Sequence, residues 1–526
     1  MPAPTPMQEI ELKFQVAAAN RQALQRAVAT KTAQRVSLRA SYFDTADRRL
    51  ARAGLALRVR KEGRRWVQTL KGSGDGLWQR LEHEVPLPLA VGAAPQIDPA
   101  LHAHTPAGDA LHEALGDGVL QPLYGTEVTR IKRLLRASGC VAELAFDRGA
   151  LVAGPQRWPL CELEFELKSG TPAALAALAA RWVERFALTL DTRSKAERGE
   201  RLARGSRLGA AVKAQPMALP DAVDAAAALR LAVGNCLRQV LGNASELAHG
   251  PKADALPGAK PGAAPDTAPD TAPDTEPDAE QLHQLRVGLR RLRTVLRELG
   301  PLSQQVSPWW GEAATSLFRA LGSARDRDAL EHGLLPVLRQ AGAHGLTLPA
   351  MTLPHDLLAP LRTAATTRLW LQLLAFAAAG GQESEAAAQP FAAAVAPRLA
   401  RLFEQVRRDA ARFAALDDVA RHRLRKRVKR LRYLSEFAAP VFSDRRVRSF
   451  LKRLAPAQEA LGAFNDVCVA RGLFQGTQRT EGTQGTAPAD PLAMFALGWL
   501  AHERDDAIVR CTQALARLRR AEAFWA

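Results

Sequence analysis

Acidic and basic side chains alternate with apolar ones in several short segments of the first third of the chain. In Glu9-Ile-Glu11-Leu-Lys13 the charged residues are two apart, and 162–168 repeats this pattern with three glutamates and a lysine. Because successive side chains of a β-strand point to opposite faces, each segment would place its charges on one face. Carboxylates bind hard divalent cations, and Arg and Lys bind phosphate oxygens. The pattern therefore favours a site for a polyphosphate and a metal ion.

The strands that would carry these charges can be arranged in two ways. If they close into a barrel with apolar faces outward against helices, the charges line the interior, where unpaired charges are costly and a ligand must neutralise them. On an open sheet, the same residues would form cross-strand ion pairs. The recurrence of the pattern favours the enclosed arrangement. Further charged positions with this spacing are Arg58, Arg60, Lys71, Arg80, Glu82, Glu84, Arg130 and Lys132.

Two basic stripes occur in the second half of the chain. The first consists of His283, Arg286, Arg290 and Arg293, and the second of His422, Arg425, Lys429 and Arg432. Spacings of three and four place each set on one face of a helix. Such a face is either solvated or binds a polyanion. Leu321–Asp326 also resembles Leu461–Asp466 at nearly the same offset, which indicates an internal duplication.

The elements fall into two classes along the chain. Period-two segments at 9–14, 55–60, 66–71, 80–85 and 162–168 predict strands, and 17–30 and 172–186 predict helices. From about Asp221 the chain is rich in Ala, Leu and Arg at helical spacing, which predicts an all-α half. Residues 251–281 carry a proline every fourth position in an acidic repeat and predict a flexible, disordered loop. A weaker interruption is predicted at 475–490.

Composition limits the possible classes of protein. The chain has 526 residues, 47% hydrophobic and 24% charged, which predicts a folded multidomain protein. A net charge of +18 indicates a polyanionic partner. The apolar stretches are too short to cross a bilayer and no secretory signal is visible, so we expect a cytoplasmic protein without a membrane span. The five dispersed cysteines predict neither disulfides nor a zinc site.

The first half resembles the CYTH family of triphosphate tunnel metalloenzymes. The resemblance rests on Glu9-x-Glu-x-Lys13, Tyr42-Phe-Asp-Thr, Leu57-Arg-x-Arg60, Thr69-Leu-Lys71, Glu162-x-Glu-x-Glu166 and Ser194-Lys-Ala-Glu-Arg-Gly199. It implies a closed antiparallel β tunnel of the α+β class over residues 7–204, with Glu9, Glu11 and Lys13 as catalytic residues. The implied ligands of Mg²⁺ or Mn²⁺ are Glu9, Glu11, Asp147, Glu162, Glu164 and Glu166. The implied phosphate-binding residues are Lys13, Arg58, Arg60, Lys71, Arg80, Arg130, Lys132 and Lys195.

The second half resembles the CHAD family over residues 222–520, after a linker at 205–221. The resemblance rests on the two stripes and on Arg325-Asp326 and Asn465-Asp466. It implies an all-α helical bundle with an internal duplication that binds inorganic polyphosphate. The implied binding residues are His283, Arg286, Arg290, Arg293, His422, Arg425, Lys429 and Arg432. This binding would associate the protein with polyphosphate granules.

The sequence therefore predicts a hydrolase, a metal-dependent triphosphatase that cleaves inorganic triphosphate to pyrophosphate and phosphate and carries a polyphosphate-binding domain. One alternative is a polyphosphate-binding adaptor with little turnover, although a pure anion binder would gain by losing Glu9 and Glu11. Another is a triphosphatase for thiamine or nucleoside triphosphates, because the same residues would bind the three phosphates of each of these substrates. Nucleic acid is not the expected partner, because the basic helices lack accompanying aromatic residues.

Overall fold

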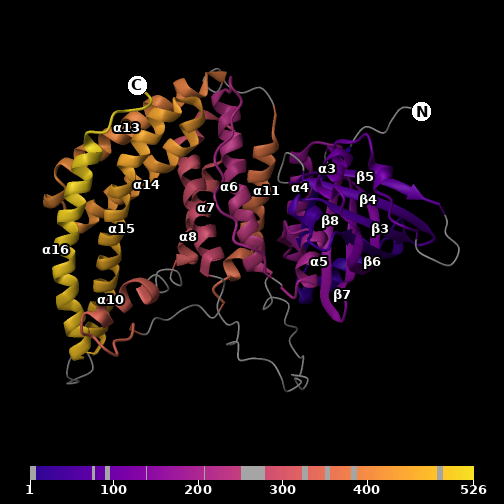
Figure 1. Ribbon diagram of the computed structural model, residues 1–526, viewed down its shortest axis with the longest axis horizontal. Helices are drawn as coiled ribbons and strands as arrows, with labels where there is room; N and C mark the ends of the chain where they lie inside the picture. The colour runs from indigo at the N-terminus through magenta and orange to yellow at the C-terminus, as the bar shows by residue number, and fades with distance from the viewer. Residues whose placement is uncertain are drawn as a thin grey trace. The chain divides into compact units, whose positions relative to one another are not determined.

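The computed structural model describes residues 7–73, 78–88, 95–137, 139–206, 208–249, 279–322, 330–349, 356–380, 388–481 and 490–526. The chain divides into two compact units (Figure 1). Unit 1 comprises 1–213, 237–285 and 358–380, and unit 2 comprises 214–236, 286–357 and 381–526. The long helices α6 and α7 each contribute residues to both units.

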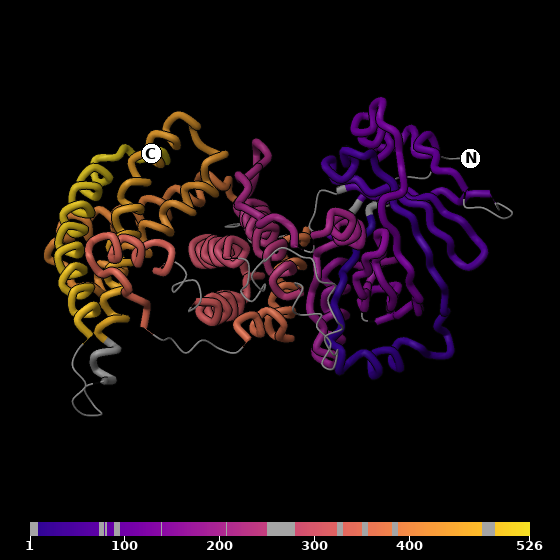
Figure 2. Tube along the Cα trace, turned by 60° about the horizontal axis from the view of Figure 1, so that its bottom comes forward, coloured from indigo at the N-terminus to yellow at the C-terminus, as the bar shows by residue number. Residues whose placement is uncertain are grey.

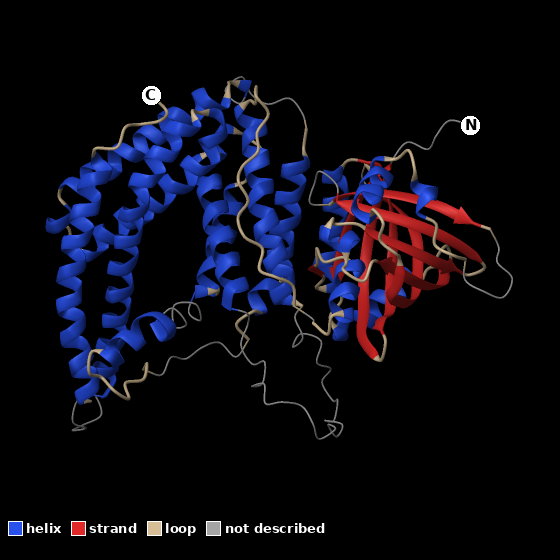
Figure 3. Ribbon diagram, viewed as in Figure 1, coloured by secondary structure: helices blue, strands red, loops and turns tan. Residues whose placement is uncertain are grey.

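Unit 1 contains an antiparallel sheet, drawn in red in Figure 3. The strand order is β5-β4-β3-β2-β6-β7-β8-β1-β9, and β1 also pairs with β5. Strand β1 bonds to β8 through Glu11–Gln15 and to β5 through Met7–Ile10. The strands are β1 (Met7–Gln15), β2 (Gln34–Asp44), β3 (Ala56–Glu62), β4 (Arg65–Ser73), β5 (Gln79–Leu87), β6 (Gln121–Ala137), β7 (Cys140–Ala153), β8 (Gln156–Gly170) and β9 (Thr189–Leu190). The five predicted strand segments are thus confirmed.

The two faces of the sheet differ as the alternation predicts. On one face Phe14, Leu163 and Phe165 are fully buried, and Phe165 packs edge-on against Trp182 of α4 (Pro172–Phe186). The charged residues lie on the other face. The helix predicted at 172–186 is confirmed, whereas the one predicted at 17–30 is shorter and consists of a 3₁₀ turn at Ala18–Asn20 and α1 (Arg21–Val28).

The charged face becomes apolar toward one end of the strands. Leu38, Val128, Leu151 and Leu160 pack there against Leu202 of α5 (Lys195–Ala203). On β8 this face therefore changes from leucine at 160 to glutamates at 162, 164 and 166. The remaining helices of unit 1 are α2 (Arg49–Arg52), α3 (Pro106–Leu115) and α11 (Ala364–Ala378), with the C-terminal half of α6 (Ala225–Ala248) and the start of α7 (Ala279–Glu298).

The part of unit 2 that the structure describes is helical (Figures 2 and 3). Its helices include α8 (Pro308–Ala320), α10 (Leu335–Gln340), α13 (Phe391–Ala411), α14 (Asp418–Ala438), α15 (Asp444–Glu481) and α16 (Pro491–Arg519). One apolar core joins α10, α15 and α16 through residues such as Leu338, Phe474 and Leu500. The helical character of the C-terminal half is confirmed, while the duplication stays a prediction.

The predicted interruptions in the helical half need two corrections. Helix α7 already begins at Ala279, so the end of the loop predicted at 251–281 was placed too late, and residues 251–278 lie outside the described residues. Helix α15 continues to Glu481, so the interruption predicted from 475 was placed too early. Both are errors of element boundaries, and in the second case Gly476 lies within α15 without ending it.

None of the helices in the described part of the chain is long and apolar enough to cross a membrane.

Candidate functional site

The strands β7 and β8 bring three carboxylates together. Asp147 lies directly opposite Glu162 in the ladder, and Glu164 follows two residues later on the same face. Asp147 and Glu162 have no exposed surface. One oxygen of each of the three residues lies within 4.8 Å of the others, a donor set of hard oxygens that suits a divalent cation. Strand alternation and register are sufficient to build this cluster.

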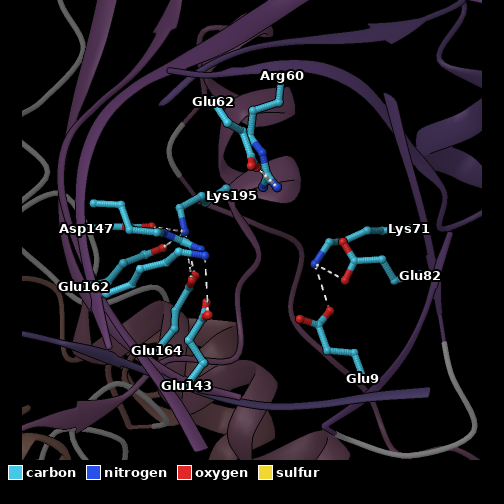
Figure 4. Close-up of polar contacts among 12 residues, drawn as sticks. Glu9, Arg60, Glu62, Lys71, Glu82, Glu143, Asp147, Glu162, Glu164 and Lys195 are labelled. Carbon is cyan, nitrogen blue, oxygen red and sulfur yellow. Dashed lines mark hydrogen bonds and ion pairs between the residues drawn. The ribbon is translucent and has the colours of Figure 1, made fainter. Parts of the chain in front are cut away.

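Three cations neutralise this acidic cluster, and Figure 4 shows Lys195 at its centre. The Lys195 ammonium lies 2.8 Å from Asp147, 2.5 Å from Glu162 and 2.6 Å from Glu164. Arg130 donates two bonds of 2.7 Å to Asp147 and one of 2.6 Å to Glu164. Burial opposes ionisation of Glu164, but Lys195 and Arg130 outweigh it and hold its pKa well below the ordinary value.

Helix α5 supplies two of these cations, Lys195 and Arg198. It begins with a capping box, in which Ser194 accepts from the backbone of Glu197 and Glu197 accepts from the backbone of Ser194. Arg198 is buried and donates to Glu162. A Cβ at Gly199 would lie 2.3 Å from Tyr124, so glycine lets α5 pack closely enough on the sheet to place Lys195.

A second acidic group lies across the cavity, where Glu9 and Glu82 share Lys71 (Figure 4). The Lys71 ammonium is 2.9 Å from Glu9 and 3.0 Å from Glu82. Burial and the neighbouring Glu82 raise the pKa of Glu9 above its ordinary value although Lys71 opposes them. One ammonium group therefore lies between two carboxyl groups, and the set of Glu9, Glu82 and Lys71 has more acidic than basic side chains.

Two arginines of β3 lie beside this second group. Arg58 lies 3.8 Å from both Glu82 and Glu84, and Arg60 lies 3.2 Å from Glu84. Arg58 also donates to the Tyr42 hydroxyl at 3.3 Å. Burial would raise the pKa of Tyr42, but Arg58 and Lys195 outweigh it and lower that pKa. The Tyr42 hydroxyl is thus held in a field of cations.

The remaining residues predicted for this site occupy different surroundings. Lys13 is buried and donates to the backbone carbonyl of Arg193. Lys132 lies 3.4 Å from Glu143, and Glu166 pairs with Lys168. Glu11, Lys132 and Glu166 all line the same cavity. Arg80 belongs to β5, but its side chain lies outside the described residues.

Most of these side chains line one cavity of about 1060 Å³, whereas Asp147, Glu162 and Arg198 lie behind its lining. Among the described residues, acidic and basic side chains line it in equal number. Sequence reasoning did not select Tyr42, Glu143 or Arg198 for the site, although Tyr42 and Arg198 lie within quoted motifs and Glu143 has the period-two spacing to Asp147. Arg238 of α6 also lines the cavity, and no sequence signal marks it.

In unit 2 the basic stripe of α7 packs against α8. Arg286, Arg290 and Arg293 all lie over the ring of Phe318, at 4.8, 5.2 and 5.0 Å from its centroid. Arg286 also donates to the carbonyl of Leu321 at 2.5 Å. A single aromatic ring is thus in contact with three guanidinium groups of one stripe. His283 is half-buried near the start of the same helix.

The stripe of α14 faces the same region. Burial first, and then the neighbouring Arg425, Arg290 and Arg286, lower the pKa of Lys429 to about 7, although Asp466 opposes them. Lys426, adjacent in the stripe sequence, has its pKa lowered by burial and by Arg293 and Arg319. The two stripes therefore form one cluster of like charges, which also includes Arg319 of α8. We call these seven residues the basic cluster: Arg286, Arg290, Arg293, Arg319, Arg425, Lys426 and Lys429.

Two other stripe residues have partners at the edge of this cluster. The His422 ring nitrogen lies 3.2 Å from the Asn465 amide oxygen, which joins the stripe to the motif at 465–466. Arg432 pairs with Glu436 on its own helix at 2.8 Å. The corresponding motif residues Arg325 and Asp326 lie outside the described residues.

Comparison with known families agrees with both resemblances. Residues 7–199 match the CYTH domain and residues 267–475 match the CHAD domain. The chain contains a CYTH domain followed by a CHAD domain. The CYTH part is related to the inorganic triphosphatase of Haemophilus influenzae, with 31% identity over 204 residues. That match covers 37% of this chain and 54% of the relative, so it spans about half of the relative's length.

Two solved structures are also similar. The CHAD domain of the plant Ricinus communis is 26% identical, covers 58% of this chain and 96% of its own, and has a TM-score of 0.44. A putative adenylyl cyclase of Hippeastrum, described as having a dominant triphosphatase activity, is 18% identical. It covers 38% of this chain and 97% of its own, with a TM-score of 0.28.

Proposed function

We propose that the CYTH domain hydrolyses inorganic triphosphate to pyrophosphate and phosphate with Mg²⁺ or Mn²⁺, inside a tunnel formed by its sheet. The observation that carries this proposal is the cavity with equal numbers of acidic and basic side chains. Pairing of β1 with both β8 and β5 supports a closed tunnel. The relationship to an inorganic triphosphatase supports the reaction.

The charge balance of the cavity is the reason to expect a metal. Lys195, Arg130 and Lys71 already lie beside carboxylates, so these cations offer little net positive charge to a triphosphate. A divalent cation bound by the carboxylates would release Lys195, Arg130 and Lys71 to bind phosphate oxygens. The residues fit such an ion, because Asp147, Glu162 and Glu164 already converge. Glu9 and Glu11 would supply further oxygens, as would Glu166.

The chain's own residues would then position the substrate. When bound, the metal would add positive charge at the reacting phosphoryl group and lower the pKa of water. Lys13, Arg58, Arg60, Lys71, Arg130, Lys132 and Lys195 would hold the phosphate oxygens, with Arg80 from β5. The apolar residues around Leu202 would close one end and exclude water. Electrostatic stabilisation and orientation would supply most of the rate, without a covalent nucleophile.

The test measures phosphate release from tripolyphosphate, ATP, thiamine triphosphate and long-chain polyphosphate, with Mg²⁺, Mn²⁺ or EDTA. We expect metal-dependent cleavage of tripolyphosphate that Glu164→Gln reduces by about 100-fold or more. A matched control is Glu127→Gln, which removes an exposed carboxylate that pairs with Arg157. Absence of turnover on every substrate would overturn the triphosphatase proposal and favour the polyphosphate-binding adaptor. A preference for ATP or thiamine triphosphate would mean that one of these, rather than inorganic triphosphate, is the substrate.

We also propose that the CHAD domain binds inorganic polyphosphate through the basic cluster. Burial and neighbouring cations lower the pKa values of Arg293, Lys426 and Lys429. Asp466 opposes the shift of Lys429. A linear polyanion would relieve this repulsion and release counterions. The predicted duplication would place the stripe containing His283 and the one containing His422, with Arg432, around a pseudo-twofold axis. Such binding would support a cytoplasmic location at polyphosphate granules.

Retention of long-chain polyphosphate by the full-length protein tests this second proposal. Lys429→Gln should weaken binding and reduce its dependence on salt concentration. Arg448→Gln is a matched control, because Arg448 is exposed and pairs with Asp444 on its own helix. Equal affinity of the two variants would exclude the basic cluster as the binding face.

A further inference from the structure

Helix α6 contributes part of the compact unit that holds the sheet, although it lies between the two family matches. Its residues from Leu237 onward belong to unit 1, and the CYTH match ends at 199 while the CHAD match begins at 267. Arg238 of this helix lines the cavity. Asn243 accepts from the Val212 backbone at 3.0 Å and donates to its carbonyl at 2.8 Å. The chain that follows α5 is therefore fastened to α6.

Two adjacent residues of α6 also hold the segment that contains Lys195. Ser245 accepts from the backbone of Thr192 at 3.0 Å. Glu246 is 3% exposed, accepts from Arg201 and lies 3.6 Å from Arg193. Because Thr192 and Arg193 precede Lys195 and Arg201 follows it, α6 fixes both ends of the segment.

Arg193 connects this anchor to Lys13. Its guanidinium group is 4% exposed and donates to both oxygens of Asp191, at 3.0 and 3.1 Å, and to the His249 carbonyl at 3.5 and 3.4 Å. Its backbone carbonyl accepts from the Lys13 ammonium. A change in the position of Arg193 would therefore move the hydrogen-bond acceptor of Lys13.

We propose that Glu246 is a positioning residue of the triphosphatase site, acting through Arg193 on Lys13 and through Arg201 on the helix that presents Lys195. This inference rests on the proposed function of the CYTH domain. It assigns a role in catalysis to a residue beyond the CYTH match. Glu246 itself is not among the residues that line the cavity.

Loss of the Glu246 charge should affect turnover and substrate binding differently. The buried guanidinium group of Arg193 and the partly exposed one of Arg201 would lose their shared carboxylate, and Arg201, which lines the cavity, would be freed toward the bound anion. An added cation strengthens ground-state binding, while displacement of Lys13 and Lys195 weakens stabilisation of the transition state. We expect kcat to fall by about 10-fold with a lower KM.

The experiment compares the full-length wild type with Glu246→Gln, Glu246→Asp and Asn243→Ala, using tripolyphosphate and Mn²⁺. Asn243 is a matched control because it is fully buried one turn earlier on α6 and bonds to Val212 and Gln239. We expect Asn243→Ala to lower Tm but to keep kcat per folded molecule. Glu246→Asp should recover part of kcat, because it restores the carboxylate.

Two results would overturn the proposal. One is an unchanged kcat in Glu246→Gln, and the other is a loss of kcat that follows Tm equally in Glu246→Gln and Asn243→Ala. If the wild type cleaves no triphosphate, the triphosphatase proposal fails separately. In that case the positioning role is tested by the affinity for tripolyphosphate, measured by calorimetry. An equal affinity of wild type and Glu246→Gln would overturn this role.

Discussion

The two charged regions of this protein differ in how far their cations are paired with carboxylates. In the CYTH cavity, Lys195 and Lys71 each lie within about 3 Å of two or more carboxylates. In the basic cluster of the CHAD domain, Lys429 is surrounded chiefly by arginines. Burial lowers the pKa of both lysines, but the carboxylates around Lys195 outweigh it and raise that pKa, whereas the arginines around Lys429 lower its pKa further.

This difference indicates how each region would accept a phosphate chain. Under the proposed functions, the nearly neutral cavity would bind an anion together with metal ions held by its carboxylates. The basic cluster has excess positive charge and would need no metal. One polypeptide could then select both a short phosphate chain with its metal and a long chain without one.

Metal removal should separate the two regions most clearly. With EDTA, we expect hydrolysis of tripolyphosphate to fall by at least about 100-fold, because the carboxylates would repel the anion without their ion. Retention of long-chain polyphosphate should be unchanged in the same sample. Phosphate release and a filter-binding assay measure the two quantities. If EDTA abolished both hydrolysis and retention, or neither of them, the expected difference between the two regions would be contradicted.

Removal of one lysine from each region should change stability in opposite directions. Lys195→Gln leaves Asp147, Glu162 and Glu164 with less compensation, so we expect the free energy of unfolding to fall by about 2 kcal/mol without metal. Mn²⁺ should restore much of this loss. Lys429→Gln removes a repelled charge and should leave stability unchanged or slightly higher at pH 6. Urea unfolding measures the free energy of unfolding of both variants. An equal decrease in the two variants would contradict the expected difference between the two regions.

The parts of the site that depend on local periodicity were predictable. Alternation alone places Glu162 and Glu164 on one face of β8, and helical spacing alone aligns Arg286, Arg290 and Arg293. Contacts between distant segments were not predictable. The approach of Arg319 to Lys426 depends on how α8 packs, and the contact of Glu246 with Arg193 depends on where α6 docks. Neither Arg319 nor Glu246 belongs to a repeating pattern in the sequence.

The pH dependence of polyphosphate binding sharpens the contrast further. A pKa of about 7 leaves Lys429 roughly half protonated at neutral pH in the free protein. A polyanion favours the protonated form, so binding takes up a proton and affinity should fall as pH rises from 6 to 8, by up to about tenfold. Lys429→Arg should flatten this profile, since arginine stays charged. An equally steep profile in that variant would assign the titration to another group, such as His422.

The smallest effect is expected within the α14 stripe itself. Arg432 is already paired with Glu436 at 2.8 Å, whereas Arg319 contributes to the shift of Lys426. Because a compensated charge adds little to the field that attracts a polyanion, Arg432→Gln should change affinity by less than about twofold. Arg319→Gln should weaken it by about fivefold or more and reduce the salt slope by close to one. Titration with long-chain polyphosphate at several salt concentrations compares the two. The reverse order would mean that helix position, rather than the compensation of each charge, determines which basic residues of α8 and α14 bind.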